Sequence, residues 1–200
     1  MNVIELKTSD PKRFEKEYYK WHEYAADYDW WETLYEDFKA DCLALGVRVD
    51  DIQFSGFYSQ GDGAAFTGQM YVYEWMEGKG YHITHPAAYL ACKDDGSYVA
   101  LNTHRNSNTM RTNLEEPLYF CDPSGIFAGL EQEAWEELVD EQIAELDFEL
   151  EVLEFCEALA DKLYKNLREE YEALTSEEAF IDACEFNEVT FEENEDAICA

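Results

Sequence analysis

The chain has 200 residues, and its 46 Asp and Glu against 14 Lys and Arg give a formal net charge of −32 at pH 7. This charge excludes strong attraction to the phosphates of DNA or RNA and to anionic membranes. Because 46% of the residues are hydrophobic and 16% are aromatic, the composition argues against disorder and predicts a folded protein with a sizeable core.

The sequence shows no sign of export or membrane insertion. No apolar run approaches the length of a transmembrane span, and residues 1–10 lack the charged-then-hydrophobic layout of a secretion signal. The six cysteines include no C-x-x-C pair, and an even count carries little weight in a chain of this length. We therefore expect a cytoplasmic protein with reduced thiols and no cofactor.

Residues 1–50 are expected to be helical. Asp10-Pro11 is typical of a helix N-cap followed by proline in the first turn. Aromatic and aliphatic residues then recur at helical spacing as far as Gly46, which is a suitable C-cap, and the acidic residues 27–29 are expected to divide this stretch in two. At this spacing the aromatic residues favour core packing over a recognition surface.

From residue 52 the apolar residues alternate with a period of two, which predicts antiparallel strands. The first strand is expected to lead into a tight turn at 59–63, and the second is expected to run from Ala64 to Trp75. Further strands are expected over 88–92 and 97–103, with another near Thr109 to Leu114.

Residues 130–174 are predicted to be mainly helical, with a bend near Asp147-Phe148, because their apolar residues lie on one side of a wheel with 3.6 residues per turn. Thr175-Ser176-Glu177-Glu178 resembles a capping box that opens a short helix over 179–185. A last strand is expected over 188–191, before an acidic tail.

These blocks predict an α+β fold, because helices and strands are segregated along the chain. A small antiparallel sheet is expected to pack against an N-terminal helical segment and a long acidic C-terminal helix. We expect one domain over residues 1–200: helical over 1–50, sheet over 51–115, helical over 128–186, and strand and tail over 187–200.

The negative charge is concentrated in the C-terminal part. Residues 112–200 contain 28 acids and 3 bases, and no Lys or Arg occurs between Arg111 and Lys162. Residues 131–161 contain 13 acids, so a continuous helix of about 46 Å would carry one charge per ~3.5 Å. This spacing is close to the roughly 3.4 Å between phosphates of one DNA strand.

Eight of these acids fall on the helix face opposite the apolar side, and we predict that they bind a partner. They are Glu133, Glu136, Glu137, Asp140, Asp147, Glu151, Glu154 and Asp161. Two interpretations stay open: the face keeps the protein soluble, or it imitates nucleic-acid phosphates and occupies the basic cleft of a nucleic-acid-binding protein. The expected partner is a basic protein, with no direct binding of nucleic acid or membrane.

His82, His85 and Cys92 have a loosely zinc-like spacing. Two histidines three positions apart on a strand point to opposite faces, and no fourth ligand is evident. We therefore expect surface histidines and no metal site.

The turn at 59–63 offers a possible ligand loop through Ser59, Gln60 and Asp62. The same side chains are suited to hydrogen-bonding the backbone of a turn, and we favour that structural role. With His104, this loop contains the residue types of a catalytic triad but not its recognisable spacing. No catalytic residue is predicted, and we do not expect an enzyme.

Residues 54–68, FSGFYSQGDGAAFTG, resemble a family of small acidic proteins from bacteriophages and mobile elements that repeat the pattern FSGF-x-SQGDGA-x-F-x-G. Weaker similarity continues at 103–105, from Leu163 to Ala179 and at 188–191. The resemblance implies a phage or plasmid setting and no established active site, and some members carry an antitoxin-like label.

Together these observations favour a phage-type acidic protein that inhibits a host nucleic-acid-binding or defence protein. Two alternatives remain: a ligand-binding or enzymatic domain that uses the turn at 59–63, and an antitoxin-like protein that neutralises a basic partner.

Overall fold

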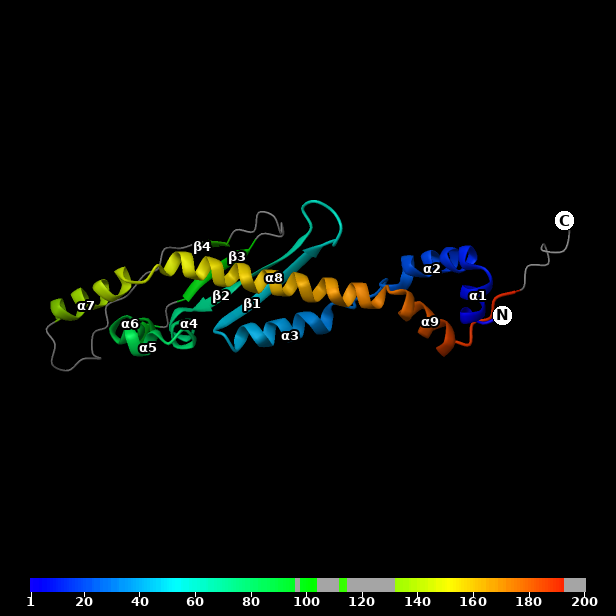
Figure 1. Cartoon of the computed structure of the whole chain (residues 1–200). Helices are drawn as coiled ribbons and strands as arrows, with labels where there is room; N and C mark the ends of the chain where they lie inside the picture. Colours follow the sequence, from blue (N-terminus) through cyan, green and yellow to red (C-terminus); the bar gives the residue numbers. More distant parts are fainter. Residues whose placement is uncertain (96–97, 104–111, 115–131, 193–200) are drawn as a thin grey trace. The chain divides into compact units, whose positions relative to one another are not determined.

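The computed structural model describes residues 1–95, 98–103, 112–114 and 132–192. In these ranges the chain forms an antiparallel sheet of four strands in the order β1-β2-β3-β4, with helices before and after it in the sequence (Figure 1). The segregation of helices and strands confirms the predicted α+β class.

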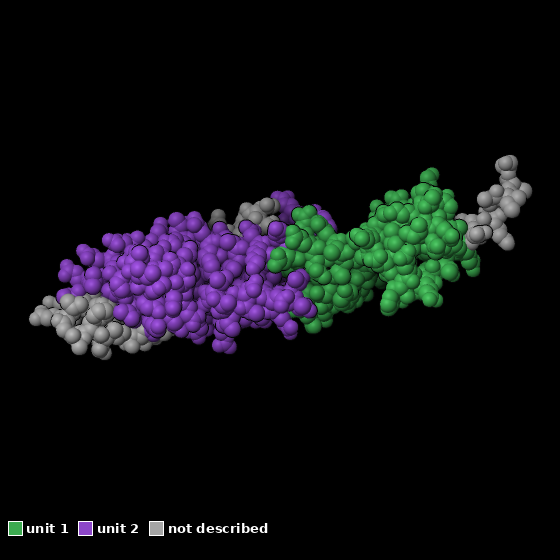
Figure 2. Space-filling model, turned by 60° about the horizontal axis from the view of Figure 1, so that its bottom comes forward, with its two compact units in different colours: residues 1–32, 166–200 green, residues 33–165 purple. Residues whose placement is uncertain are grey.

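The chain groups into two compact units, which Figure 2 shows in different colours. Unit 1 consists of residues 1–32 and 166–200, and unit 2 consists of residues 33–165. The helix α8, Phe148–Leu174, contributes residues to both units. The single domain expected over residues 1–200 stays a prediction.

Unit 1 contains α1 (Val3–Ser9), α2 (Pro11–Ala25) and α9 (Glu177–Phe186). The predicted start of α2 is confirmed, because the Asp10 side chain accepts a hydrogen bond from Arg13 N at 3.1 Å and proline occupies the first turn. Its apolar side packs inward as predicted. The buried cluster consists of Val3, Leu6, Phe14, Phe180 and Cys184.

The C-terminal part of unit 1 differs from the sequence prediction at one point. Ser176 caps α9 by accepting a hydrogen bond from Ala179 N at 3.1 Å, so the helix begins within the predicted capping segment. The strand expected over 188–191 is wrong. Glu188 has a left-handed φ of 51°, which interrupts extended backbone, and Phe191 instead exchanges two backbone hydrogen bonds with Met1.

The sheet lies in unit 2 and is built from β1 (Val47–Ser55), β2 (Gly63–Tyr71), β3 (Tyr98–Thr103) and β4 (Thr112–Leu114). The predicted hairpin between the first two strands is confirmed, with Ser55 paired to Gly63 across the turn. β4 falls within the segment expected near Thr109 to Leu114, of which residues 109–111 lie outside the described residues.

Two helices replace predicted strand. The strand expected as far as Trp75 ends at Tyr71, and α4 (Val72–Gly78) follows it. The strand expected over 88–92 is wrong, because these residues belong to α6 (Pro86–Asp95), which follows the short α5 (Tyr81–Thr84). A short apolar run does not distinguish a strand from a buried helix, and proline at the helix start favours the helix.

Aromatic contacts join helices to the sheet within unit 2. Phe38 of α3 (Glu32–Leu43) packs against Phe66 of β2 with ring centroids 5.6 Å apart. Phe57, just after β1, packs against Tyr164 of α8 with centroids 5.7 Å apart. Figure 1 shows α3 and α8 running beside the strands. These contacts place the core of unit 2 between the sheet and the two helices.

The acidic helical segment is divided as the sequence predicted. α7 (Gln132–Ala144) and α8 are separate helices, and the bend falls over residues 145–147. α7 packs on α6 through a small cluster of Ala87, Ala91 and Val139. None of the helices in the described ranges combines the length and the apolar composition that a bilayer span requires.

Candidate binding surface

The predicted acidic residues lie on α7, on the connection after it and on the first half of α8. Six of the eight have exposed side chains: Glu136, Glu137, Asp140, Asp147, Glu154 and Asp161. Glu151 is half-buried, and Glu133 lies in α7 with a side chain outside the described part of the structure. The six exposed residues and Glu141 are named the acidic face below.

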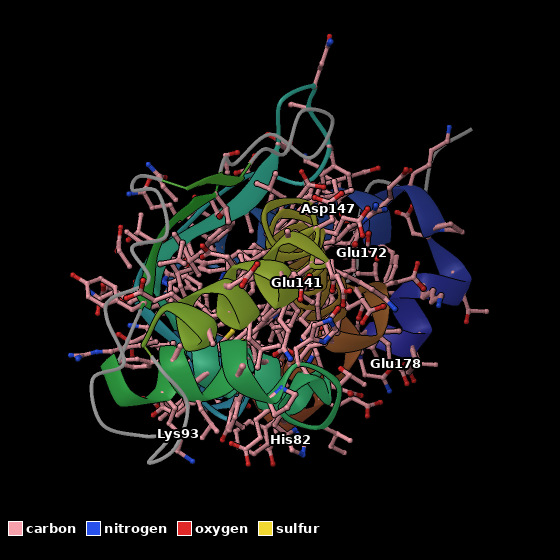
Figure 3. All side chains as sticks on the ribbon, turned by 90° about the vertical axis from the view of Figure 1, so that its left-hand side faces the viewer. His82, Lys93, Glu141, Asp147, Glu172 and Glu178 are labelled. Carbon is pink, nitrogen blue, oxygen red and sulfur yellow. The ribbon has the colours of Figure 1, made fainter. Side chains whose placement is uncertain are left out.

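The acidic side of α7 points away from its core contact. Val139 is 5% exposed and packs on α6, whereas Glu137, Asp140 and Glu141 are exposed. No ion pair joins these three carboxylates to a cation among the described residues. In Figure 3, Lys93 on α6 lies well away from Glu141, and its Nζ bonds Tyr89 Oη at 3.0 Å.

The acidic face is not one continuous helix. α7 ends at Ala144 and α8 begins at Phe148, so the linear match to DNA phosphates over an unbroken 131–161 helix is wrong. Phe148, the first residue after the break, is buried against Trp75, with ring centroids 5.0 Å apart. Exposed Asp147 lies at the break, so the charges form two acidic segments joined there (Figure 3).

Glu151 has two partners within unit 2. Its Oε1 accepts a hydrogen bond of 2.6 Å from Tyr81 Oη, and Lys79 Nζ lies 3.7 Å from its Oε2. The hydrogen bond to this carboxylate is the main reason that the pKa of Tyr81 is raised to about 12. Glu151 therefore ties α8 to α5 and to the segment before it.

Basic side chains also occur at two other places beside the acidic helices. Lys162 Nζ lies 2.8 Å from Asp41 Oδ2 of α3, and this hydrogen bond raises the pKa of Lys162. His85 Nε2 lies 3.5 Å from Glu145 Oε2. Both pairs involve acids outside the predicted eight, so they do not neutralise the acidic face.

The acidic side chain of the turn at 59–63 binds the backbone of the turn itself. Asp62 Oδ2 accepts hydrogen bonds from Tyr58 N at 2.8 Å and from Ser59 N at 2.6 Å. Gly56 permits this arrangement, because a Cβ there would lie 2.8 Å from the same oxygen. The contacts agree with the structural role favoured from the sequence, whereas a ligand role for Ser59, Gln60 and Asp62 stays a prediction.

The histidines and the cysteine that the sequence suggested as metal or catalytic residues do not form a site in the described structure. His82 is exposed on α5 and His85 follows that helix, so the strand assumed for them is wrong. Cys92 is buried in α6. Among the described residues, no group of three His, Cys, Asp or Glu side chains is placed to hold a metal ion. His104 lies outside the described residues.

A pocket of about 550 Å³ is the feature that sequence reasoning missed. It lies between residues 43–46, α4 and α8. Trp75 lines it, is 2% exposed, and has an indole Nε1–H without an acceptor in the described structure. A buried unsatisfied donor costs roughly 1–3 kcal/mol.

One sequence signal could have located this pocket. Gly78-Lys79-Gly80 begins three residues after Trp75, and closely spaced glycines are typical of a helix end. Expecting a strand up to Trp75 hid this signal.

The fold and this surface define an acidic α+β protein with a cation-poor helical face. Residues 30–177 match the model of a family described as a domain of unknown function (DUF8835). This match covers most of the chain, so the protein belongs to the DUF8835 family. Comparison with the curated proteins and with the solved structures finds no match.

Proposed function

We propose that this protein binds a basic protein through its acidic face and thereby occupies a surface that would otherwise bind nucleic acid. The observation that carries the proposal is the set of exposed carboxylates on α7, on α8 and on the connection between them that have no ion-pair partner in the described structure. Glu137, Asp140, Asp147, Glu154 and Asp161 belong to this set.

The electrostatic cost of the acidic face supports this proposal. Like charges three or four residues apart on a helix destabilise it by about 0.2–0.5 kcal/mol per pair. Glu137 has Asp140 and Glu141 at these spacings, and no lysine lies between them. A basic partner would remove the repulsion and release the bound counterions, so binding would be favoured at low salt.

The biological setting is proposed from the resemblance of residues 54–68 to proteins of bacteriophages and mobile elements. A phage- or plasmid-borne acidic protein of the cytoplasm would inhibit a host nucleic-acid-binding or defence protein by occupying its basic cleft. The motif lies inside the 30–177 match to the DUF8835 family.

The test compares two triple variants with the same change in net charge. One neutralises the acidic face with Glu137→Gln, Asp140→Asn and Glu154→Gln. The control neutralises three exposed acids of α9 with Glu178→Gln, Asp182→Asn and Glu185→Gln. Binding of a fluorescein-labelled lysine nonapeptide is measured by fluorescence anisotropy at low and high salt.

We expect the acidic-face variant to weaken peptide binding by about tenfold or more at low salt, and the α9 variant to weaken it much less. An equal loss in both variants would mean that only the net charge matters, and this result would overturn the proposal. Proteins captured from a host lysate at low salt and released at high salt would then be examined for nucleic-acid binding.

A further inference from the structure

The pocket beside α4 has apolar walls from three segments. Leu43 and Leu45 come from the segment before β1, Trp75 comes from α4, and Phe155 comes from α8. Leu43 is 61% exposed and Leu45 is 45% exposed, so these two leucines present apolar surface to solvent. A volume of about 550 Å³ lies within the roughly 300–1,000 Å³ of typical ligand pockets.

Gly46 shapes this pocket through its backbone. Its φ of 80° lies in the left-handed region, and a Cβ at this position would come within 2.6 Å of Glu74 Cβ. Glycine therefore lets the chain pass close to α4. Gly46 O also accepts a hydrogen bond from Tyr71 N at 2.9 Å, which holds this wall against the end of β2.

Two polar groups of the pocket are suited to a ligand. The carboxylates of Glu74 and Glu77 line the pocket, and no ion pair joins either of them to a cation in the described ranges. Tyr73 Oη bonds Glu74 Oε1 at 2.9 Å, and Tyr89 Oη bonds Glu77 Oε2 at 3.1 Å.

Lys79 is the basic residue among the described residues that line the pocket, and it already contacts Glu151 and Trp75. Lys79 Nζ lies 3.7 Å from Glu151 Oε2 and 5.7 Å from the centre of the Trp75 ring. The pocket therefore combines apolar walls with two carboxylates. An occupant must supply apolar surface and positive charge.

A basic peptide segment meets both requirements. An apolar side chain would fill the space between the leucines and Phe155, and a neighbouring lysine or arginine would meet Glu74 or Glu77. The position agrees with this occupant, because α8 carries both Glu154 of the acidic face and Phe155 of the pocket lining.

We propose that this pocket binds one apolar anchor side chain of a lysine- or arginine-rich segment of the partner. This inference rests on the proposed function, because it specifies how the basic partner is recognised. The acidic face would attract the segment, and the pocket would select those segments in which an apolar residue lies among the basic ones.

The test uses two labelled pentapeptides, Lys-Lys-Leu-Lys-Lys and Lys-Lys-Ser-Lys-Lys, and measures binding to the full chain by fluorescence anisotropy. The peptides have equal charge and differ in the anchor. We expect the leucine peptide to bind the unmodified protein about tenfold more tightly than the serine peptide, because burying most of a leucine side chain favours binding.

A pair of matched variants locates this preference. Leu45→Ser removes a pocket wall, and Leu150→Ser removes a leucine of similar exposure, 48% against 45%, that does not line the pocket. Both sites are exposed, so we expect both variants to fold. Leu45→Ser should abolish the preference for the leucine peptide, whereas Leu150→Ser should retain it.

The outcomes separate the two proposals. Equal binding of both peptides by the unmodified protein, or a preference that survives Leu45→Ser, would overturn the pocket proposal and leave the acidic-face proposal standing. Absence of binding of either peptide at low salt would count against both. Circular dichroism of each variant confirms that a lost preference does not come from a lost fold.

Discussion

The repulsion within the acidic face leads to a quantitative prediction: neutralising two of its carboxylates should stabilise the protein. Glu137→Gln with Asp140→Asn removes four like-charge spacings on α7. Glu137 has Glu133 four residues behind it and Asp140 and Glu141 three and four residues ahead, and Asp140 has Glu136 four residues behind it. At roughly 0.2–0.5 kcal/mol per pair, the free energy of unfolding should rise by about 1 kcal/mol at low salt.

Differences in helix propensity should not obscure this rise in the free energy of unfolding. Gln and Glu have nearly the same propensity, and so do Asn and Asp. Both residues are exposed, so no packing is lost. Urea denaturation followed by circular dichroism measures the effect at about 0.02 M and about 1 M NaCl, where screening should remove most of the gain.

A control variant changes one glutamate in an attractive pair. Glu17 lies 2.9 Å from Lys20 on α2, so Glu17→Gln should leave the stability unchanged or lower it slightly at low salt. If the α7 variant were no more stable than the unmodified protein at low salt, its carboxylates would already be compensated. The argument for a repulsive face kept for binding would then fail.

Three further predictions concern the contacts that hold the surface in place. Tyr81→Phe should lower the free energy of unfolding by an amount that is constant below pH 10 and is lost as the pH rises towards about 12. The reason is that the pKa of Tyr81 is raised to about 12, so its neutral form is the stabilising one. Urea denaturation across this pH range measures the difference between the two proteins. Asp62→Ala should lower the free energy of unfolding by about 1–2 kcal/mol in the same assay, because two backbone N–H groups of the turn lose their acceptor. Ser59→Ala should lower it much less. Equal losses in the two variants would contradict the structural role of Asp62 in the turn. Gln142→Ala should lower the free energy of unfolding by about 1 kcal/mol and speed amide hydrogen exchange at Ala88. The reason is that the Gln142 side chain accepts hydrogen bonds from the first turn of α6. Unchanged exchange would exclude this capping role.

Local signals in the sequence predicted much of the secondary structure. Asp10-Pro11 marked the start of α2, Ser176 lies within the predicted capping segment of α9, and the glycines around Asp62 marked the hairpin. Each signal depends on contacts within a few residues, and such contacts form wherever the sequence permits them. The concentration of negative charge is likewise a property of the sequence alone.

Longer-range contacts decided what the sequence pattern could not. Residues 88–92 form part of a helix in which Ala91 packs with Val139 of α7, and Gln142, more than fifty positions away, caps the first turn of α6. The pattern of a short apolar run is compatible with either structure, so only the packing partner selects one.

In the acidic face, too, some features follow from the sequence and others from the tertiary structure. The sequence by itself determined how many carboxylates the helical segment carries and that no lysine separates them. Only the tertiary structure decided that Glu151 is held by Tyr81 and Lys79 while Asp140 remains exposed, and that a pocket opens beside Trp75. The physical reason is that side-chain spacing follows from the helix, whereas burial and pairing depend on segments that are distant in the sequence.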